Sequence, residues 1–133
     1  MTTVILDTVG LIALWNRSDQ WHAAATAAFL ALDPKTTRLV TTTYVLLECG
    51  NAAARRPYRD KVIAIRDGLS QAGDLYEPTP QDLEQAWIDY ARGLAGSAGI
   101  VDHVSFAVMR RLGLAEVFTN DRHFTAAGFT ILF

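Results

Sequence analysis

Cysteine is almost absent from this sequence, because Cys49 is the only one in 133 residues. A single cysteine excludes a disulfide framework and a cysteine metal site within one chain. The chain also has no apolar run long enough to cross a membrane. Its first residues, Met1 to Thr3, lack the basic region and the cleavage pattern of a signal peptide. We therefore expect a cytoplasmic protein that does not associate with membranes.

An excess of positive charge is missing as well. Twelve Lys and Arg residues stand against 14 Asp and Glu residues, which gives a formal net charge of −2. This balance argues against a histone-like or generic nucleic-acid coat protein, but it does not exclude a nuclease. Half of the residues are hydrophobic and a fifth are charged, as in globular proteins. The length predicts a single domain over residues 1–133 with a substantial core.

Short β-like runs alternate with helical segments along the whole chain. The β-branched and buried-strand patterns predict strands at 3–6, 38–42, 75–77, 115–118 and 129–133. Apolar residues at helical spacing predict helices at 9–14, 20–32, 44–56, 60–71, 80–90, 102–112 and 122–127, with Thr43 as a plausible N-cap of the third. This alternation predicts an α/β fold in three layers, with a five-stranded parallel sheet flanked by helices.

Four carboxylates stand at element boundaries next to apolar segments. Taken singly, each has a structural explanation: Asp102 and Asp121 could be helix N-caps worth about 1 kcal/mol each, Asp7 could end a strand, and Glu48 could face solvent. Taken together, they are the hard oxygen ligands that Mg²⁺ or Mn²⁺ binds. Without a metal they would repel one another, and some would have to stay protonated. Their convergence at the carboxyl edge of the sheet therefore predicts a divalent ion.

The motifs around these acids resemble those of a known family. The motifs are Asp7-Thr8 after the first strand, Glu48 in Tyr-Val-Leu-Leu-Glu, Asp102 in Ile-Val-Asp-His-Val-Ser-Phe and Asp121 in Thr-Asn-Asp-Arg-His-Phe. They resemble the acidic signature of PIN-domain ribonucleases, and within that family the chain looks most like the VapC toxins of type II toxin–antitoxin pairs. The C-terminal motifs are the most specific part of the resemblance, which extends over nearly the whole chain.

The resemblance implies an activity, a cofactor and partners. It implies an endoribonuclease that depends on Mg²⁺ or Mn²⁺ and hydrolyses tRNA, rRNA or mRNA with a metal-activated water. The four acids would bind metal or orient water, with Asp121 the most peripheral, and the hydroxyls of Thr8 and Thr119 would hold carboxylates in place. It further implies a homodimer and a VapB-type antitoxin that occludes the active-site groove. Val9 departs from the small or polar residue that relatives often carry there.

Other chemically capable residues carry weaker predictions. Arg55 and Arg56 lie in the densest basic patch and are candidates for holding RNA phosphates. His123 is interpreted as a surface histidine near a turn, although it could touch a phosphate or the leaving group. His103 has no second histidine at zinc-like spacing, so we reject a zinc site. The tryptophans lie on helical patterns, where a core or interface role is favoured over base stacking: Trp15, Trp21 and Trp87.

Two alternatives from other functional classes stay open. A phosphoacceptor receiver module has this length and alternation, but it needs paired acids after the first strand and a lysine late in the chain. Here Asp7 stands alone at that point, and the lysines are Lys35 and Lys61. A third alternative, the dehalogenase-like phosphatases, is disfavoured because these enzymes need a second aspartate two residues after the nucleophile, where this chain has Val9. A catalytically inactive, partner-binding PIN-like domain is disfavoured by the presence of all four acids.

Overall fold

The computed structural model describes residues 1–133. Strands and helices alternate as predicted. The strands are β1 (Thr2–Leu6), β2 (Thr37–Thr42), β3 (Leu75–Tyr76), β4 (Glu116–Phe118) and β5 (Thr130–Ile131). The helices are α1 (Thr8–Trp15), α2 (His22–Leu30), α3 (Thr43–Ala53), α4 (Arg59–Ala72), α5 (Pro80–Ala91), α6 (Ile100–Leu112) and α7 (Arg122–Ala126).

The strands form one parallel sheet, which confirms the predicted fold class. Their order is β3-β2-β1-β4-β5, so β1 is the central strand and pairs with β2 on one side and β4 on the other. From β1 the chain first builds outward through β2 and β3, and then returns to the opposite side of β1 to form β4. The strand order therefore reverses between β1 and β4, which is where open parallel sheets form a crevice at their carboxyl ends.

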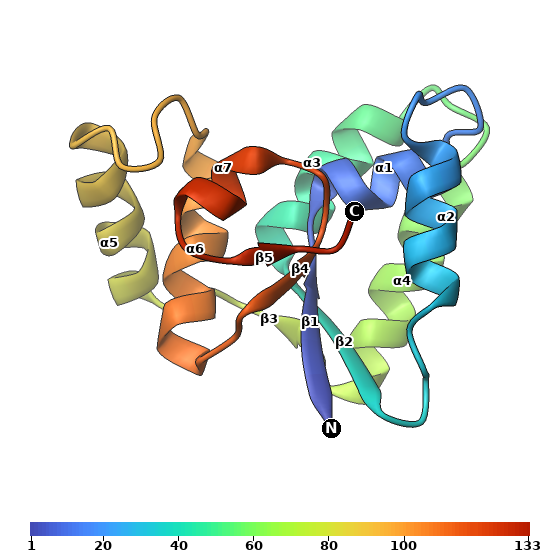
Figure 1. The fold of residues 1–133 in the computed structure, drawn as a ribbon, viewed down its shortest axis with the longest axis horizontal. Coiled ribbons are helices and arrows are strands. Elements are labelled where there is room, and N and C mark those ends of the chain that lie inside the picture. The colour runs from blue at the N-terminus through green and yellow to red at the C-terminus, as the bar shows by residue number, and fades with distance from the viewer.

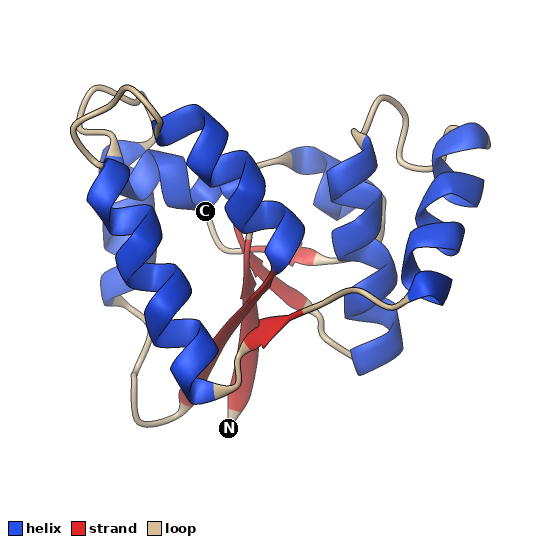
Figure 2. Ribbon diagram, turned by 180° about the vertical axis from the view of Figure 1, so that it is seen from behind, coloured by secondary structure: helices blue, strands red, loops and turns tan.

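Helices cover both faces of the sheet, so the molecule has three layers (Figure 1). Val4 and Leu6 point to one face and join a core with side chains of α1 to α4. Ile5 points to the other face, where it packs with Phe106 of α6 and Phe124 of α7. This alternation follows from the two-residue period of a strand. Figure 2 shows the same sheet from behind, enclosed between the two groups of helices.

Some predicted boundaries differ from the structure for identifiable reasons. Thr42, not Thr43, is the N-cap of α3, because the Thr42 hydroxyl accepts a hydrogen bond from the Val45 backbone N–H at 3.3 Å. Helix α6 begins at Ile100 rather than at Asp102, after Gly99 in extended conformation. The last strand is limited to Thr130–Ile131, because β4 offers it only two paired positions. None of the helices is both long enough and apolar enough to span a membrane.

Candidate metal and active site

The end of β1 places Asp7 at the centre of the carboxyl edge. The carboxylate is buried, with 2% of the residue exposed. The hydroxyl of Thr119, just beyond β4, donates to Asp7 Oδ2 at 2.8 Å and accepts from the backbone N–H of Asp121 at 3.1 Å. One hydroxyl therefore ties Asp7 to the segment that carries Asp121, although 112 residues separate Asp7 from Thr119.

A close backbone approach holds these two segments together. Gly10, in the first turn of α1, lies against the end of β4: a Cβ atom added to it would be 2.0 Å from the carbonyl oxygen of Phe118. The backbone N–H of Asp7 also donates to that carbonyl oxygen, at 3.4 Å. Glycine is needed here because any side chain would push α1 away from β4 and change the position of Asp7.

Helix α3 brings Glu48 to the same edge. Its Oε1 accepts a hydrogen bond from the hydroxyl of Thr8 at 2.7 Å. Thr8 follows Asp7 directly, so this contact links the start of α1 to α3. The two threonines that the sequence singled out therefore each contact one of the candidate acids.

Asp102 lies in the first turn of α6, not at its N-cap as its sequence position suggested. Gly99 occupies the cap, and its backbone N–H donates to Asp102 Oδ2 at 3.3 Å. The first turn of a helix favours negative charge, because its free N–H groups point toward the N-terminus. The hydrogen bond from Gly99 therefore holds the Asp102 side chain in place, although the residue is only partly buried.

The acids interact through their charges. Burial, together with the neighbouring carboxylates of Asp102 and Asp121, raises the pKa of Asp7 from 3.8 to about 7, against the opposing hydrogen bond from Thr119. Burial also raises the pKa of Asp102 to about 6, together with the charges of Asp121 and Glu48. The charges of Asp7, Asp102 and Asp121 therefore interact with one another, and the charge of Glu48 interacts with that of Asp102. None of the four acids forms an ion pair with a lysine or an arginine.

Asp121 and His123 form a contact that the sequence interpretation missed. Asp121 Oδ1 caps α7 by accepting the backbone N–H of His123 at 2.9 Å, and it also lies 2.8 Å from His123 Nδ1. The other ring nitrogen, Nε2, is 3.1 Å from Ser97 Oγ in the loop before α6. His123 is thus fixed at both ring nitrogens and is not a free surface histidine. The spacing Asp-x-His could have predicted the contact between Asp121 and His123. Nothing in the sequence predicts the contact with Ser97, because a glycine-rich loop has no periodic pattern.

The donor set fits a divalent cation. Asp102, Asp121 and His123 each offer a ligand atom, and these atoms lie within 4.8 Å of one another. Buried carboxylates that raise one another's pKa are stabilised when a cation neutralises them. Carboxylate oxygens are the ligands that Mg²⁺ and Mn²⁺ prefer. The residues present therefore suit such an ion.

The other residues that the sequence suggested as candidates do not contact the acidic site. Arg55 and Arg56 are exposed in the turn after α3, about two helical turns beyond Glu48. His103 and Ser105 are buried in α6, and their Nδ1 and Oγ atoms have no hydrogen-bond partner. Trp15 packs against Tyr58 in the core region, whereas two other tryptophans are exposed: Trp21 and Trp87.

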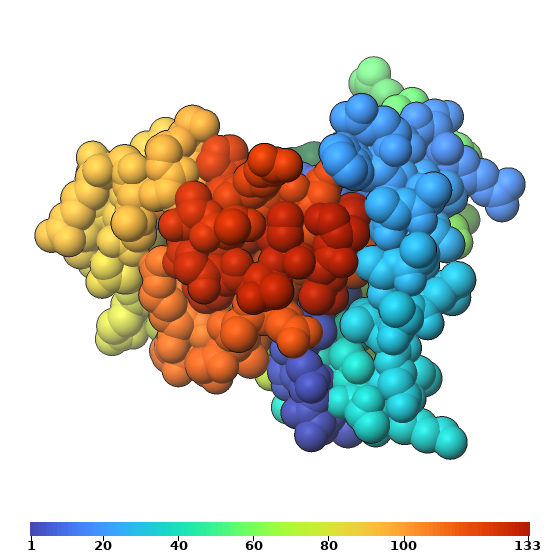
Figure 3. Space-filling view, viewed as in Figure 1, coloured from blue at the N-terminus to red at the C-terminus, as the bar shows by residue number.

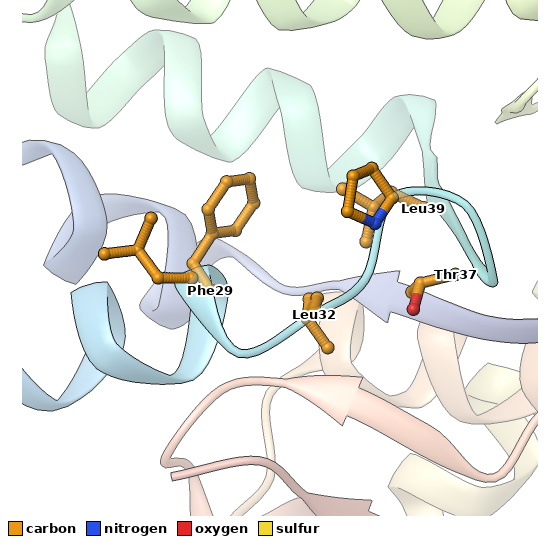
Figure 4. Close-up of a pocket in the computed structure, with 6 residues that line it drawn as sticks. Phe29, Leu32, Thr37 and Leu39 are labelled. Carbon is orange, nitrogen blue, oxygen red and sulfur yellow. The ribbon is translucent and has the colours of Figure 1, made fainter.

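One apolar surface pocket is separate from the acids. Figure 4 shows this pocket of about 330 Å³ between the end of α2 and β2, with Phe29, Leu32, Thr37 and Leu39 around it. None of the four acids lines it. On the face seen in Figure 3, the C-terminal part of the chain fills the middle, between α5 and α2. A search for pockets alone would therefore not have identified the acidic site.

Comparisons with known proteins show the family of the chain. The family model described as PIN domain matches residues 4–130. VapC20 of Mycobacterium tuberculosis, described as a 23S rRNA-specific endonuclease, is 32% identical over 127 residues, which cover 95% of each chain. The chain therefore belongs to the PIN domain family.

Solved structures give the same fold. The crystal structure of VapC20 from Mycobacterium tuberculosis, described as a sarcin-ricin loop cleaving toxin, superposes with a TM-score of 0.80 at 28% identity and covers 96% of both chains. The crystal structure of FitAcB from Neisseria gonorrhoeae has a TM-score of 0.64 at 17% identity, covering 98% of this chain and 96% of that one. DNA-bound VapBC from Salmonella typhimurium has a TM-score of 0.62 at 16% identity, with 98% and 97% covered. The last two comparisons concern the fold alone.

Proposed function

We propose that residues 1–133 act as one PIN domain that is the toxin of a type II toxin–antitoxin pair and hydrolyses RNA phosphodiester bonds in the presence of Mg²⁺ or Mn²⁺. The observation that carries this proposal is the convergence of Asp7, Glu48, Asp102 and Asp121 at the β1–β4 edge without a lysine or arginine partner. Family membership and the VapC20 relative support it.

The chain's own residues would act by holding and orienting. When bound, a divalent ion supplies positive charge for the reacting phosphate and makes a water molecule more acidic. Asp7 and Asp102 would be its main ligands, because they have the raised pKa values that an ion would lower. Glu48 and Asp121 would complete the site or orient water. The hydroxyls of Thr8 and Thr119 hold Glu48 and Asp7 in place, as hydrogen-bonded neighbours of metal ligands commonly do.

Ribosomal RNA is the substrate to test first. The VapC20 relative is described as specific for 23S rRNA and as cleaving the sarcin-ricin loop. With a formal charge of −2, the chain has no general attraction for RNA. Recognition of a folded hairpin by shape and local contacts would suit such a protein. Arg55 and Arg56 are exposed and have no carboxylate partner, so they are free to contact phosphates.

We also propose two protein partners, a VapB-type antitoxin that occludes the active-site groove and a second copy of the chain. Exposed apolar side chains are consistent with such contacts: Leu47 of α3 is 62% exposed, Ile63 of α4 54% and Trp87 of α5 55%. Light scattering of the purified chain, alone and with the antitoxin, measures both assemblies. A monomer at micromolar concentration that no co-expressed small protein inhibits would contradict the partner proposals.

The test of the activity compares wild type with Asp7→Asn on total cellular RNA and on a 23S rRNA hairpin, with Mg²⁺, Mn²⁺ or EDTA. Discrete fragments that require both the metal and Asp7 would support the proposal, and their ends would identify the cleaved bond. Cleavage that survives EDTA or Asp7→Asn would contradict it. No cleavage by folded, antitoxin-free protein would favour a partner-binding domain without catalytic activity.

A further inference from the structure

A cleft at the far ends of two helices is lined by cations. The loop after α1 and the turn between α3 and α4 lie side by side (Figure 1, Figure 2), and a hollow of about 370 Å³ lies between them. Two of its lining residues carry a positive charge, and none carries a carboxylate. We call this hollow the basic cleft. The loop side is formed by Asn16, Arg17 and Ser18, and the opposite side by Pro57, Tyr58 and Lys61.

The two cations of the basic cleft are available to a ligand. Arg17 and Lys61 are both exposed, and neither forms an ion pair. Basic residues near the end of a helix often bind its last carbonyl groups. The hydrogen bonds from arginine side chains to carbonyl oxygens belong instead to Arg59, which binds Ala54, and to Arg110. The fold therefore leaves the charges of Arg17 and Lys61 unused.

The basic cleft has a packed floor. Tyr58 is 6% exposed, and the centre of its ring lies 6.4 Å from that of the partly buried Trp15. Tyr58 belongs to the core of α1 to α4, and Trp15 packs against this core. The two cations are therefore carried by segments that the core holds in place, so a ligand needs to order little besides their side chains.

Two helices lead from the acidic site to the basic cleft. Asp7 is the N-cap of α1, and its C-cap, Asn16, lines the cleft. A helix of eight residues is about 12 Å long. Helix α3 carries Glu48 and ends at Ala53, shortly before the turn that forms the other side of the cleft. Because the nucleotides of a stacked strand rise about 3.4 Å each, the cleft lies about three or four nucleotides from the acids.

We propose that the basic cleft binds the phosphate backbone of the RNA substrate, about three or four nucleotides from the scissile bond, through Arg17 and Lys61. The inference rests on the proposed RNA-cleaving function and deepens it. A chain with a formal charge of −2 and four acids at its active site needs a local concentration of cations to hold RNA. The exposed Arg55 and Arg56, in the turn before Pro57, extend the same positive surface. An acidic protein segment is the competing occupant, and RNA is favoured because α1 and α3 connect the cleft to the acids.

Binding of a fluorescently labelled 23S rRNA hairpin in EDTA, which prevents metal-dependent cleavage, tests the basic cleft separately from activity. The double variant Arg17→Gln/Lys61→Gln should bind the hairpin about tenfold more weakly, because two exposed charge pairs are lost. The slope of log K against log salt should become shallower by about 1.4 to 1.8, since each phosphate contact contributes about 0.7 to 0.9. In Mg²⁺ the double variant should raise KM for cleavage by a similar factor and keep kcat within about twofold, because a remote contact is made equally before and during the reaction.

Lys35→Gln/Arg92→Gln is the matched control, because it removes two exposed cations that have no ion-pair partner and lie outside the basic cleft. It should change hairpin binding less than about twofold. Equal hairpin affinities and equal salt slopes of the two double variants would overturn the inference, whereas metal-dependent cleavage by wild type would still support the proposed function. A loss of affinity for the antitoxin but not for the hairpin in Arg17→Gln/Lys61→Gln would overturn the inference in favour of an acidic protein segment.

Discussion

The acids of this molecule have opposite surroundings in two places. One is the α5–α6 pair, formed by Asp82 and Asp89 of α5 beside arginines of α6, and the other is the set of four acids at the β1–β4 edge. In the α5–α6 pair, Asp82 is 4% exposed and accepts a forked set of hydrogen bonds from Arg111, the shortest at 2.8 Å. The Arg111 guanidinium holds the pKa of Asp82 below its ordinary value. Asp89, 8% exposed, has Arg110 at 3.6 Å. These acids are neutralised within the fold.

Burial raises the pKa of both Asp7 and Asp82, but at the β1–β4 edge no arginine offsets it. Asp7 is as buried as Asp82, but its neighbours are other carboxylates, and its pKa rises to about 7. A fold that can place an arginine beside Asp82 has no arginine beside Asp7. We therefore propose that Asp82 contributes to stability, whereas Asp7 contributes to a site for a cation that comes from solution.

The largest expected effect comes from removing the charge of Asp7. Asp7→Asn keeps the shape of the side chain and the Thr119 contact, but it removes a candidate ligand. We expect RNA cleavage to fall about a thousandfold, because metal-based charge stabilisation is worth several kcal/mol. Initial rates on the same RNA measure this. The matched control is Asp82→Asn, which alters a buried acid that has an arginine partner. An equal loss of activity in both variants would contradict the proposal that Asp7 serves catalysis and Asp82 serves stability.

The raised pKa values predict how stability depends on pH in the metal-free protein. In the folded state Asp7 binds its proton up to about pH 7, whereas the unfolded chain releases it near pH 3.8. The folded state thus binds more protons in this interval, and the free energy of unfolding falls as pH rises from about 4 to 7, by up to about 4 kcal/mol.

Denaturant unfolding at several pH values, in the presence of EDTA, measures this dependence. Asp7→Asn should flatten it and should make the metal-free protein more stable than wild type at pH 8. A wild-type stability that rises through this interval would mean that Asp7 is not held in its protonated form by the fold.

A smaller effect is expected from the hydroxyl that supports Asp7. Thr119→Val keeps the branched shape but removes the donor at 2.8 Å from Asp7 Oδ2 and the acceptor for the Asp121 N–H. We expect metal affinity and cleavage to fall about 10- to 100-fold, as for other residues that orient metal ligands. Thr130→Val, on the exposed side of β5, is the control. Activity of Thr119→Val within twofold of wild type would show that Asp7 is positioned without it.

The smallest effect should come from a change in the Asp82–Arg111 ion pair. Arg111→Gln removes the partner of Asp82, and we expect a loss of about 1 kcal/mol in the free energy of unfolding, because the arginine side chain is 41% exposed and solvent screens the ion pair. Cleavage should stay within about twofold when measured well below the melting temperature. A loss of activity larger than the loss of stability explains would mean that the α5–α6 pair contributes to the site.

Much of this organisation could be predicted from sequence. The apolar run Val4 to Leu6, followed by Asp7, indicates a buried strand that ends in an acid, and the strand–helix alternation predicts a parallel sheet. The sheet then brings Asp7 and Asp121 to one edge. Asp102 was assigned the wrong helix position, since Gly99 carries no side-chain signal for an N-cap.

The contacts that depend on the path of loops could not be predicted. Ser97 reaches His123 because the loop before α6 folds through left-handed conformations at Gly93, Ala95 and Gly96. Such turns leave no hydrophobic period in the sequence. The absence of a cation beside Asp7 is equally a property of three dimensions, because ten arginines and two lysines could have reached it.

The most direct test of the central claim is calorimetric titration of Mn²⁺ into wild type, Asp7→Asn and Asp82→Asn at pH 7. If the acids at the β1–β4 edge form a cation site, wild type and Asp82→Asn will bind Mn²⁺ alike, and Asp7→Asn will bind it at least about tenfold more weakly. Equal binding by all three proteins, or no binding by any of them, would contradict the account.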